Sequence, residues 1–179
     1  MRNATRISLA LGTSAALLTL SALPASAMEQ VTDAIIQVEP GALGIDVGEP
    51  LATVELKPGE EATFALPKVT VTDTRAGTAS WATHVSLTNF NTEVLDAKPI
   101  TAAGATYTVT PDSLVPTGII DDLTSADVTW TAEGEELQAV TAAGVEGNNT
   151  AIWAASLAVI VPDAALAGAY SATLTHSVL

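Results

Sequence analysis

The sequence predicts an almost all-β protein, an immunoglobulin-like antiparallel β-sandwich that follows an N-terminal signal peptide. The chain is rich in Val, Thr and Ala, and its apolar residues recur mostly at a spacing of two. That spacing is the pleat period of half-buried strands. Gly, Pro, Asp and Asn separate the apolar runs, and helices do not alternate with strands. We therefore expect two packed antiparallel sheets, with a closed barrel as the alternative.

The N-terminus has the pattern of an export signal. Arg2 and Arg6 give a positive leading segment, an apolar run follows over residues 7–23, and Ala25-Ser26-Ala27 forms a small-x-small cleavage site. A membrane-spanning helix needs about 20 apolar residues, whereas this run is shorter and is closed by Pro24. We expect residues 1–27 to be removed, which leaves no integral membrane segment in an extracellular, secreted or wall-associated protein.

The expected mature chain, residues 28–179, has a length typical of a single domain. The full sequence has 20 acidic residues, no cysteine and a formal net charge of −14, and loss of Arg2 and Arg6 makes the mature chain more acidic still. This charge excludes nucleic acid as a partner and opposes binding to anionic lipid or wall polymers. The remaining cations are Lys57, Lys68, Arg75 and Lys98.

Ten candidate strands are expected in the mature chain. They are Ala34–Val38, Ala52–Leu56, Thr63–Leu66, Val69–Thr72, Ser80–Phe90, Thr106–Thr110, Asp127–Thr131, Leu137–Thr141, Thr150–Val161 and Gly168–Val178. Around Pro67 the apolar alternation slips by one residue, and a proline cannot donate to a strand ladder. A β-bulge or an edge position is therefore predicted there.

Local turn signals predict two strand pairings. Asp73–Gly77 is expected to close a hairpin between the strands on either side of it, because Asp bonds the backbone ahead and Gly tolerates positive φ. The strands at 150–161 and 168–178 are expected to pair with each other, with a turn of helix considered for Asp163–Ala167 in their connection. The acidic segments 118–130 and 132–140 are interpreted as long loops.

No catalytic pattern is visible. Nucleophilic catalysis needs an oriented base, and the only imidazoles are His84, on the expected solvent-facing parity, and His176, on the apolar parity. No local pair of acids marks a glycosidase, although a hydrolase with carboxylates from separate strands stays open as an alternative. We expect a non-enzymatic protein without a cofactor.

Other candidate sites are weighed in the same way. Asp121, Asp122 and Asp127 lack the alternating ladder and terminal Glu of a calcium loop, so a solvated acidic loop is favoured over a metal site. The sequence Asn148-Asn149-Thr150 fits a glycosylation acceptor, but a turn into the next strand is favoured. Core packing is favoured over a sugar-stacking platform for the three tryptophans, Trp81, Trp130 and Trp153.

Two segments resemble the WxL domain, a surface module of Gram-positive bacteria. They are VTVTDTRAGTASWATHVSLTNF and VPDAALAGAYSATLTHSVL, which follow the family's Asp-Thr-Arg-x5-Trp outline and its closing strand. The resemblance covers roughly residues 66–179. The chain departs from the family at its two motifs, because Trp81-Ala82-Thr83 and His176-Ser177-Val178 stand where Trp-x-Leu is expected.

WxL domains are associated with non-covalent attachment to peptidoglycan. The resemblance therefore implies an exported sandwich that binds peptidoglycan or another cell-wall polymer, with Trp81, Thr83, His176 and Val178 as its contact residues. A histidine in place of a tryptophan would weaken stacking on sugars and add a group that titrates near neutral pH. The alternative is a structural or adhesive surface subunit that binds other surface proteins through acidic loops or a sheet edge.

Overall fold

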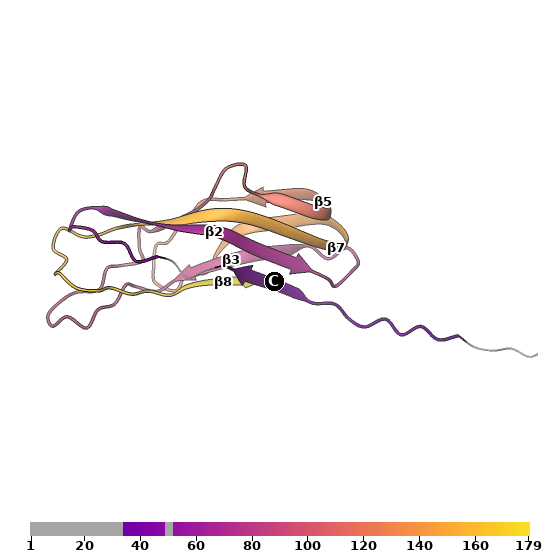
Figure 1. Ribbon diagram of the computed structural model, residues 1–179, viewed down its shortest axis with the longest axis horizontal. Helices are drawn as coiled ribbons and strands as arrows, with labels where there is room; N and C mark the ends of the chain where they lie inside the picture. Colours follow the sequence, from indigo (N-terminus) through magenta and orange to yellow (C-terminus); the bar gives the residue numbers. More distant parts are fainter. Residues whose placement is uncertain (1–33, 49–51) are drawn as a thin grey trace, which may run out of the picture. The chain divides into compact units, whose positions relative to one another are not determined.

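The computed structural model describes residues 34–48 and 52–179, and these residues form antiparallel strands and no helix (Figure 1). The predicted signal peptide lies outside the described residues. Val38–Leu179 make one compact unit. Its strands are β1 Leu43–Val47, β2 Glu61–Asp73, β3 Trp81–Leu87, β4 Thr106–Val109, β5 Val115–Ser125, β6 Val128–Thr129, β7 Leu137–Ile160 and β8 Leu174–Val178. The predicted all-β, sandwich-like class is confirmed.

The longest strand, β7, belongs to both faces of the sandwich. Its first part, Leu137–Ala142, pairs with β3, and its second part, Asn149–Ile160, pairs with β2. Between these parts Gly144 and Gly147 have φ of 62° and 66°, a region that glycine enters without strain. The strand can therefore bend and carry the hydrogen-bonded ladder from one face to the other. The sheet has the strand order β1-β2-β7-β3-β8 and is consequently almost barrel-shaped.

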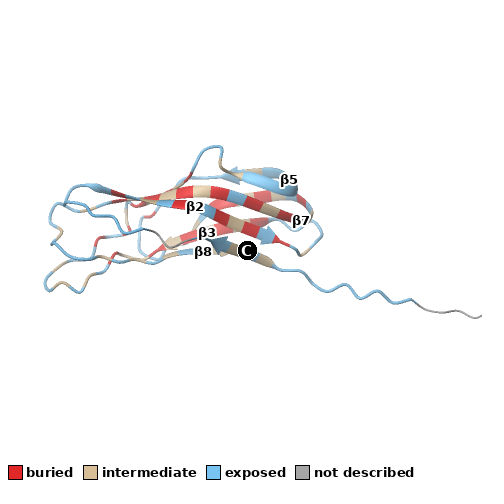
Figure 2. Cartoon of the chain, viewed as in Figure 1, coloured by how far each residue is buried: buried red, intermediate tan, exposed pale blue. Residues whose placement is uncertain are grey.

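The core lies between these two faces. Buried and more exposed residues alternate along β2, β3 and β7, as the spacing of two predicts (Figure 2). All three tryptophans are buried, which confirms their assignment to the core over an exposed sugar platform. Tyr107 of β4 is fully buried as well, and Phe90 is also part of the core.

The slip in alternation around Pro67 is a β-bulge, as predicted. The register of β2 against β7 shifts between Leu66 and Val69, so the two expected strands form a single strand with an irregularity at the proline. In the same way, the two strands expected at 137–141 and 150–161 are parts of β7. Asn148–Asn149–Thr150 therefore lies within a strand, and the turn expected there was wrong.

Both predicted strand pairings were wrong. β2 and β3 do not pair with each other, because each pairs with a different part of β7 and Asp73–Ser80 connects the two faces. β8 pairs with β3 and not with β7. The C-terminal part of β7 already has β2 on one edge and β4 on the other, which leaves no edge for β8.

Several boundaries also differ. Ala34–Val38 and Ala52–Leu56 are not strands, since neither finds a pairing partner among the described residues. The acidic segment 118–130 is largely strand β5, whose Pro116 is tolerated because β5 pairs only with β7 and is an edge strand. Asp163–Ala167 forms a turn without helix. β1 was not expected from the sequence.

Candidate binding groove

The Asp-Thr-Arg stretch that carries the resemblance closes the loop after β2. Asp73 is almost fully buried, and its carboxylate accepts hydrogen bonds from Nε of Arg75 at 3.0 Å and from Nη2 at 2.8 Å. The backbone N–H of Arg75 donates to the same carboxylate at 2.9 Å. These bonds to Arg75 lower the pKa of Asp73 against the opposing effect of burial. The ion pair therefore fixes the start of the Asp73–Ser80 connection.

The tryptophan of the same stretch fixes the other end of that connection. The indole Nε1 of Trp81 donates to Oδ1 of Asn149 on β7 at 3.0 Å, and both side chains are buried. The amide of Asn149 in turn donates to the carbonyl of Gly147 at 3.2 Å, and the N–H of Gly147 donates to the carbonyl of Gly77 at 2.7 Å. Trp81 thus serves the packing of this loop on β7.

The four contact residues that the resemblance implies lie close together on the inner face of β3 and β8. Thr83 pairs with Val178, and His176 pairs with Val85 in the same ladder. Thr83 is fully buried, and its hydroxyl accepts from the N–H of Val140 at 3.1 Å. His176 and Val178 are half-buried. The fold brings these residues together, but it turns the side chains of Trp81 and Thr83 away from solvent.

His176 belongs to a buried aromatic cluster. Its Nε2 lies 3.3 Å from the hydroxyl of Tyr107, which also accepts a hydrogen bond from Nε1 of Trp153 at 3.2 Å. Burial lowers the pKa of His176 to about 4 and raises that of Tyr107 to about 12. A neutral imidazole fits this arrangement, because Tyr107 then has an acceptor for its single proton. The expectation that this position titrates near neutral pH was therefore wrong.

The remaining sequence candidates lie apart from one another. His84 is on the outward parity of β3 and is half-buried. Asp121 and Asp122 are exposed on β5, and Asp127 is exposed just beyond it. Within the described part of the chain, no three His, Asp or Glu side chains gather in a way that would hold a metal ion. These acids form a solvated strand surface in place of the expected loop.

An apolar groove with a volume of about 830 Å³ lies at one end of the sandwich. It lies where β2 and β8 begin and where β3 and β7 end (Figure 1). Buried core side chains of Ala62, Leu87, Leu157 and Val159 reach it, and the coil segments 52–58 and 165–172 line it. We call this surface the end groove.

The composition of the end groove is distinct from that of the rest of the molecule. Among the described residues that line it, only Glu55 and Lys57 are charged, although the chain as a whole is strongly acidic. Phe64 and Phe90 stack on each other inside it, with ring centroids 6.1 Å apart. On its rim Leu166 is 46% exposed, and the hydroxyl of Tyr170 donates to the carbonyl of Leu166 at 3.0 Å. Apolar side chains fit this surface better than charged polymers.

Strand lengths explain why the groove forms. β1 pairs with β2 only opposite Val69–Asp73, so the sheet narrows at the other end of β2. The segment 52–58, whose composition predicted a strand, runs beside the groove as coil and leaves the core partly open. The sequence feature that corresponds to the groove is the strand-like composition of Ala52–Leu56. Strand propensity alone does not reveal that this stretch lacks a pairing partner among the described residues.

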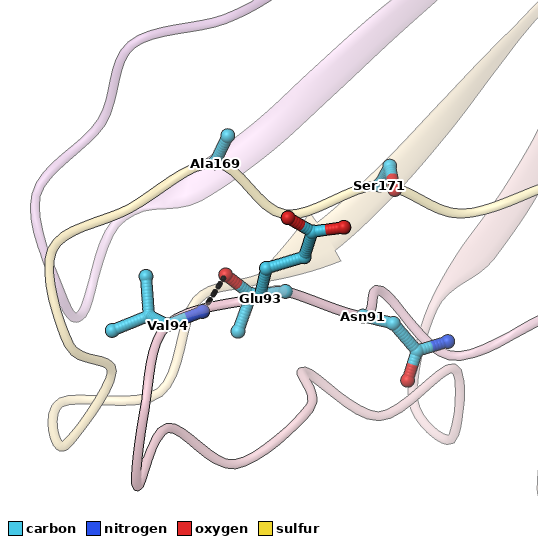
Figure 3. Close-up of a pocket in the computed structure, with 6 residues that line it drawn as sticks. Asn91, Glu93, Val94, Ala169 and Ser171 are labelled. Atoms are coloured by element: carbon cyan, nitrogen blue, oxygen red, sulfur yellow. Dashed lines mark hydrogen bonds between the residues drawn. The ribbon is translucent and has the colours of Figure 1, made fainter.

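A second hollow, of about 630 Å³, adjoins the end groove. It is lined by Asn91–Val94 together with Ala169 and Ser171, and the backbones of Asn91 and Ser171 bond each other in both directions at 2.8 Å. Figure 3 shows the carboxylate of Glu93 reaching toward the segment that carries Ala169 and Ser171. With one carboxylate and no base or cation in its lining, the hollow has no catalytic set.

No known family model matches this chain, and no curated protein matches its sequence. Within residues 34–48 and 52–179 there is no helix with the length and hydropathy that a membrane crossing requires.

Proposed function

We propose that this chain is an exported, non-enzymatic surface subunit that binds another polypeptide through the end groove. The observation that carries this proposal is the groove itself, a concave apolar surface with two charged residues among the described residues of its lining, on a chain with a net charge of −14. Exposed apolar concavities of this kind mark sites of protein interaction or ligand binding. A structural or adhesive role is consistent with a chain of about one domain.

A polypeptide is a better occupant than a glycan on the geometry of the aromatic residues. Sugar binding uses flat aromatic faces open to solvent, and all three tryptophans are buried. The two phenylalanines of the groove stack with an offset, and Phe90 is buried while Phe64 is half-buried. Apolar side chains at alternating positions of an extended peptide need only depth and low charge, which the groove offers.

Non-covalent association with peptidoglycan at the cell wall is a second candidate. It is favoured by the resemblance to WxL domains, which rests on Asp73, Arg75, Trp81 and the closing strand. Because Trp81 and Thr83 are buried, contact with a wall polymer would have to use neighbouring surface or follow a local opening of β3 and β8. Extracellular localisation, in secreted or wall-bound form, belongs to both candidates.

One experiment separates the two candidates. The chain from Met28 is mixed with two preparations of Gram-positive walls, one that retains its proteins and one stripped of them with detergent and protease, and pelleting is measured. We expect pelleting only with the protein-bearing walls, and a decrease when Leu166, on the groove rim, is replaced by Asn. Equal pelleting with stripped walls, unaffected by Leu166→Asn, would favour peptidoglycan and contradict the groove.

Leu95→Asn is the matched control for this experiment. Leu95 is 84% exposed and does not line the end groove, so this variant makes the same chemical change outside the groove lining. It should pellet like the unchanged protein. Hydrolysis of a labelled glycan by the same preparation would contradict the non-enzymatic assignment.

A further inference from the structure

Among the described residues, one edge of β2 has no strand partner beside the end groove. β7 pairs with β2 on one side over its whole length, whereas β1 pairs with the other side at Val69–Asp73 and the N–H of Gly48 donates to the carbonyl of Lys68. Among the described residues, nothing outside β7 bonds the backbone of Glu61–Leu66. Ala62 and Phe64 of this same stretch line the groove. A strand added at this edge would therefore place alternate side chains in the groove.

The same chain contains an unpartnered apolar segment of suitable length. Ala34–Val38 has no regular secondary structure, and its Ile35, Ile36 and Val38 are 90%, 88% and 85% exposed. Large apolar side chains with this exposure are costly to leave in water. Five residues of strand span about 17 Å, which fits within the roughly 20 Å of the six-residue edge Glu61–Leu66.

Charge favours this segment as the occupant. Two copies of a strongly acidic chain repel each other over most of their surfaces. Ala34–Val38 contains no charged residue, and the described lining of the groove has one acid, Glu55, and one base, Lys57, while the edge of β2 adds Glu61. Two copies therefore meet at the segment and the groove with less like-charge repulsion than elsewhere on their acidic surfaces.

We propose that Ala34–Val38 of a second copy adds as a strand to the open edge of β2. The period of two then directs Ala34, Ile36 and Val38 into the end groove and leaves Ile35 on the opposite face. Each copy offers one segment and one groove, so the contact is heterologous and links copies into chains or closed rings. This inference rests on the proposed function, because it names the polypeptide that the groove binds.

The test is the self-association of the Met28–Leu179 chain, which contains every strand of the sheet. Sedimentation equilibrium over a range of concentrations should show oligomers that Ile36→Asn weakens at least tenfold. Ile35→Asn, which changes an equally exposed isoleucine on the other face, should weaken them less than threefold. Leu166→Asn should act like Ile36→Asn, and Leu95→Asn like the unchanged chain. Excess synthetic peptide of residues 34–41 should dissociate the oligomers.

Other results would overturn the proposal. One is a monomer at every concentration, and another is association that Ile36→Asn leaves unchanged. A third is docking of Ala34–Val38 in the groove of its own chain, in which case the segment would be protected from solvent at every protein concentration and added peptide would not remove that protection. The wall experiment distinguishes this failure from that of the proposed function. If pelleting still depends on Leu166 while copies do not associate, the groove binds a different polypeptide and only the present inference fails.

Discussion

At the scale of single residues, the side chains that carry the family resemblance have structural roles in this fold. Asp73 and Arg75 close the connection after β2, and Trp81 fastens its far end to Asn149. A resemblance at such positions does not locate a surface that binds a partner, because Trp81 and Asp73 are buried.

Replacing Asn149 by Ala should destabilise the protein. The change leaves the buried Nε1–H of Trp81 without its acceptor, and an unsatisfied buried donor costs about 1–3 kcal/mol. Chemical denaturation with tryptophan fluorescence measures the free energy of unfolding. Asn148→Ala is the control, since Asn148 is exposed and its loss should change that free energy by less than about 0.5 kcal/mol. Equal effects of the two variants would contradict the role given to Asn149.

The buried histidine should make stability depend on pH. The pKa of His176 falls from 6.5 to about 4 on folding, so below pH 6.5 the unfolded chain binds a proton that the folded chain does not. The free energy of unfolding should therefore decrease as the pH falls from 6.5 to 4, by on the order of 3 kcal/mol, and this contribution should level off below pH 4.

Denaturation at a series of pH values checks this expectation. His176→Phe removes the titrating group, so the decrease between pH 6.5 and 4 should become smaller. The pKa of Asp73 is also lowered, and its contribution is lost only below the ordinary carboxyl value of 3.8, outside this window. A decrease that His176→Phe does not reduce would contradict the assignment to His176.

At the scale of elements, the bend in β7 decides the topology. Gly144 has φ of 62°, and a Cβ at this position would lie 2.7 Å from Cβ of Asp121 on β5. Gly147 has nearly the same φ, 66°, but no atom within 4 Å of a built Cβ. The first glycine is required by both backbone conformation and space, and the second by conformation alone.

Gly144→Ala should therefore cost more than Gly147→Ala. Each variant bears about 1–3 kcal/mol of strain for a positive φ, and only Gly144→Ala must also displace Asp121 or β5. Thermal denaturation of both variants gives the comparison. If the two melt at the same temperature, Asp121 yields without cost and the close approach does not constrain the bend.

The elements also show how far the sequence predicts the fold. The period of two predicted the core face of β3, and the parity slip at Pro67 predicted the bulge in β2, because both are local consequences of the backbone. The pairing of strands was not predicted. A turn signal such as Asp73–Gly77 does not show whether the chain reverses within one sheet or crosses to the other, since the answer depends on the distant bend in β7.

At the scale of the whole molecule, the candidate site follows from what the strands leave uncovered. Residues such as Phe64, Phe90 and Tyr170 are far apart in the sequence and meet only because β1 is short and segment 52–58 is coil. The composition is strongly acidic, and against it the described lining of the groove is nearly uncharged. The groove could be located only from the three-dimensional structure, since no local motif in the sequence marks it.

We propose that binding uses the end groove while the Asp-Thr-Arg and Trp residues maintain the fold. The most direct measurement compares Leu166→Asn with Trp81→Phe in the pelleting assay with protein-bearing walls, at a temperature where both are folded. We predict that Leu166→Asn pellets at least tenfold less, while Trp81→Phe pellets like the unchanged chain despite a lower melting temperature. The reverse order of effects would contradict the claim and return the binding site to β3 and β8.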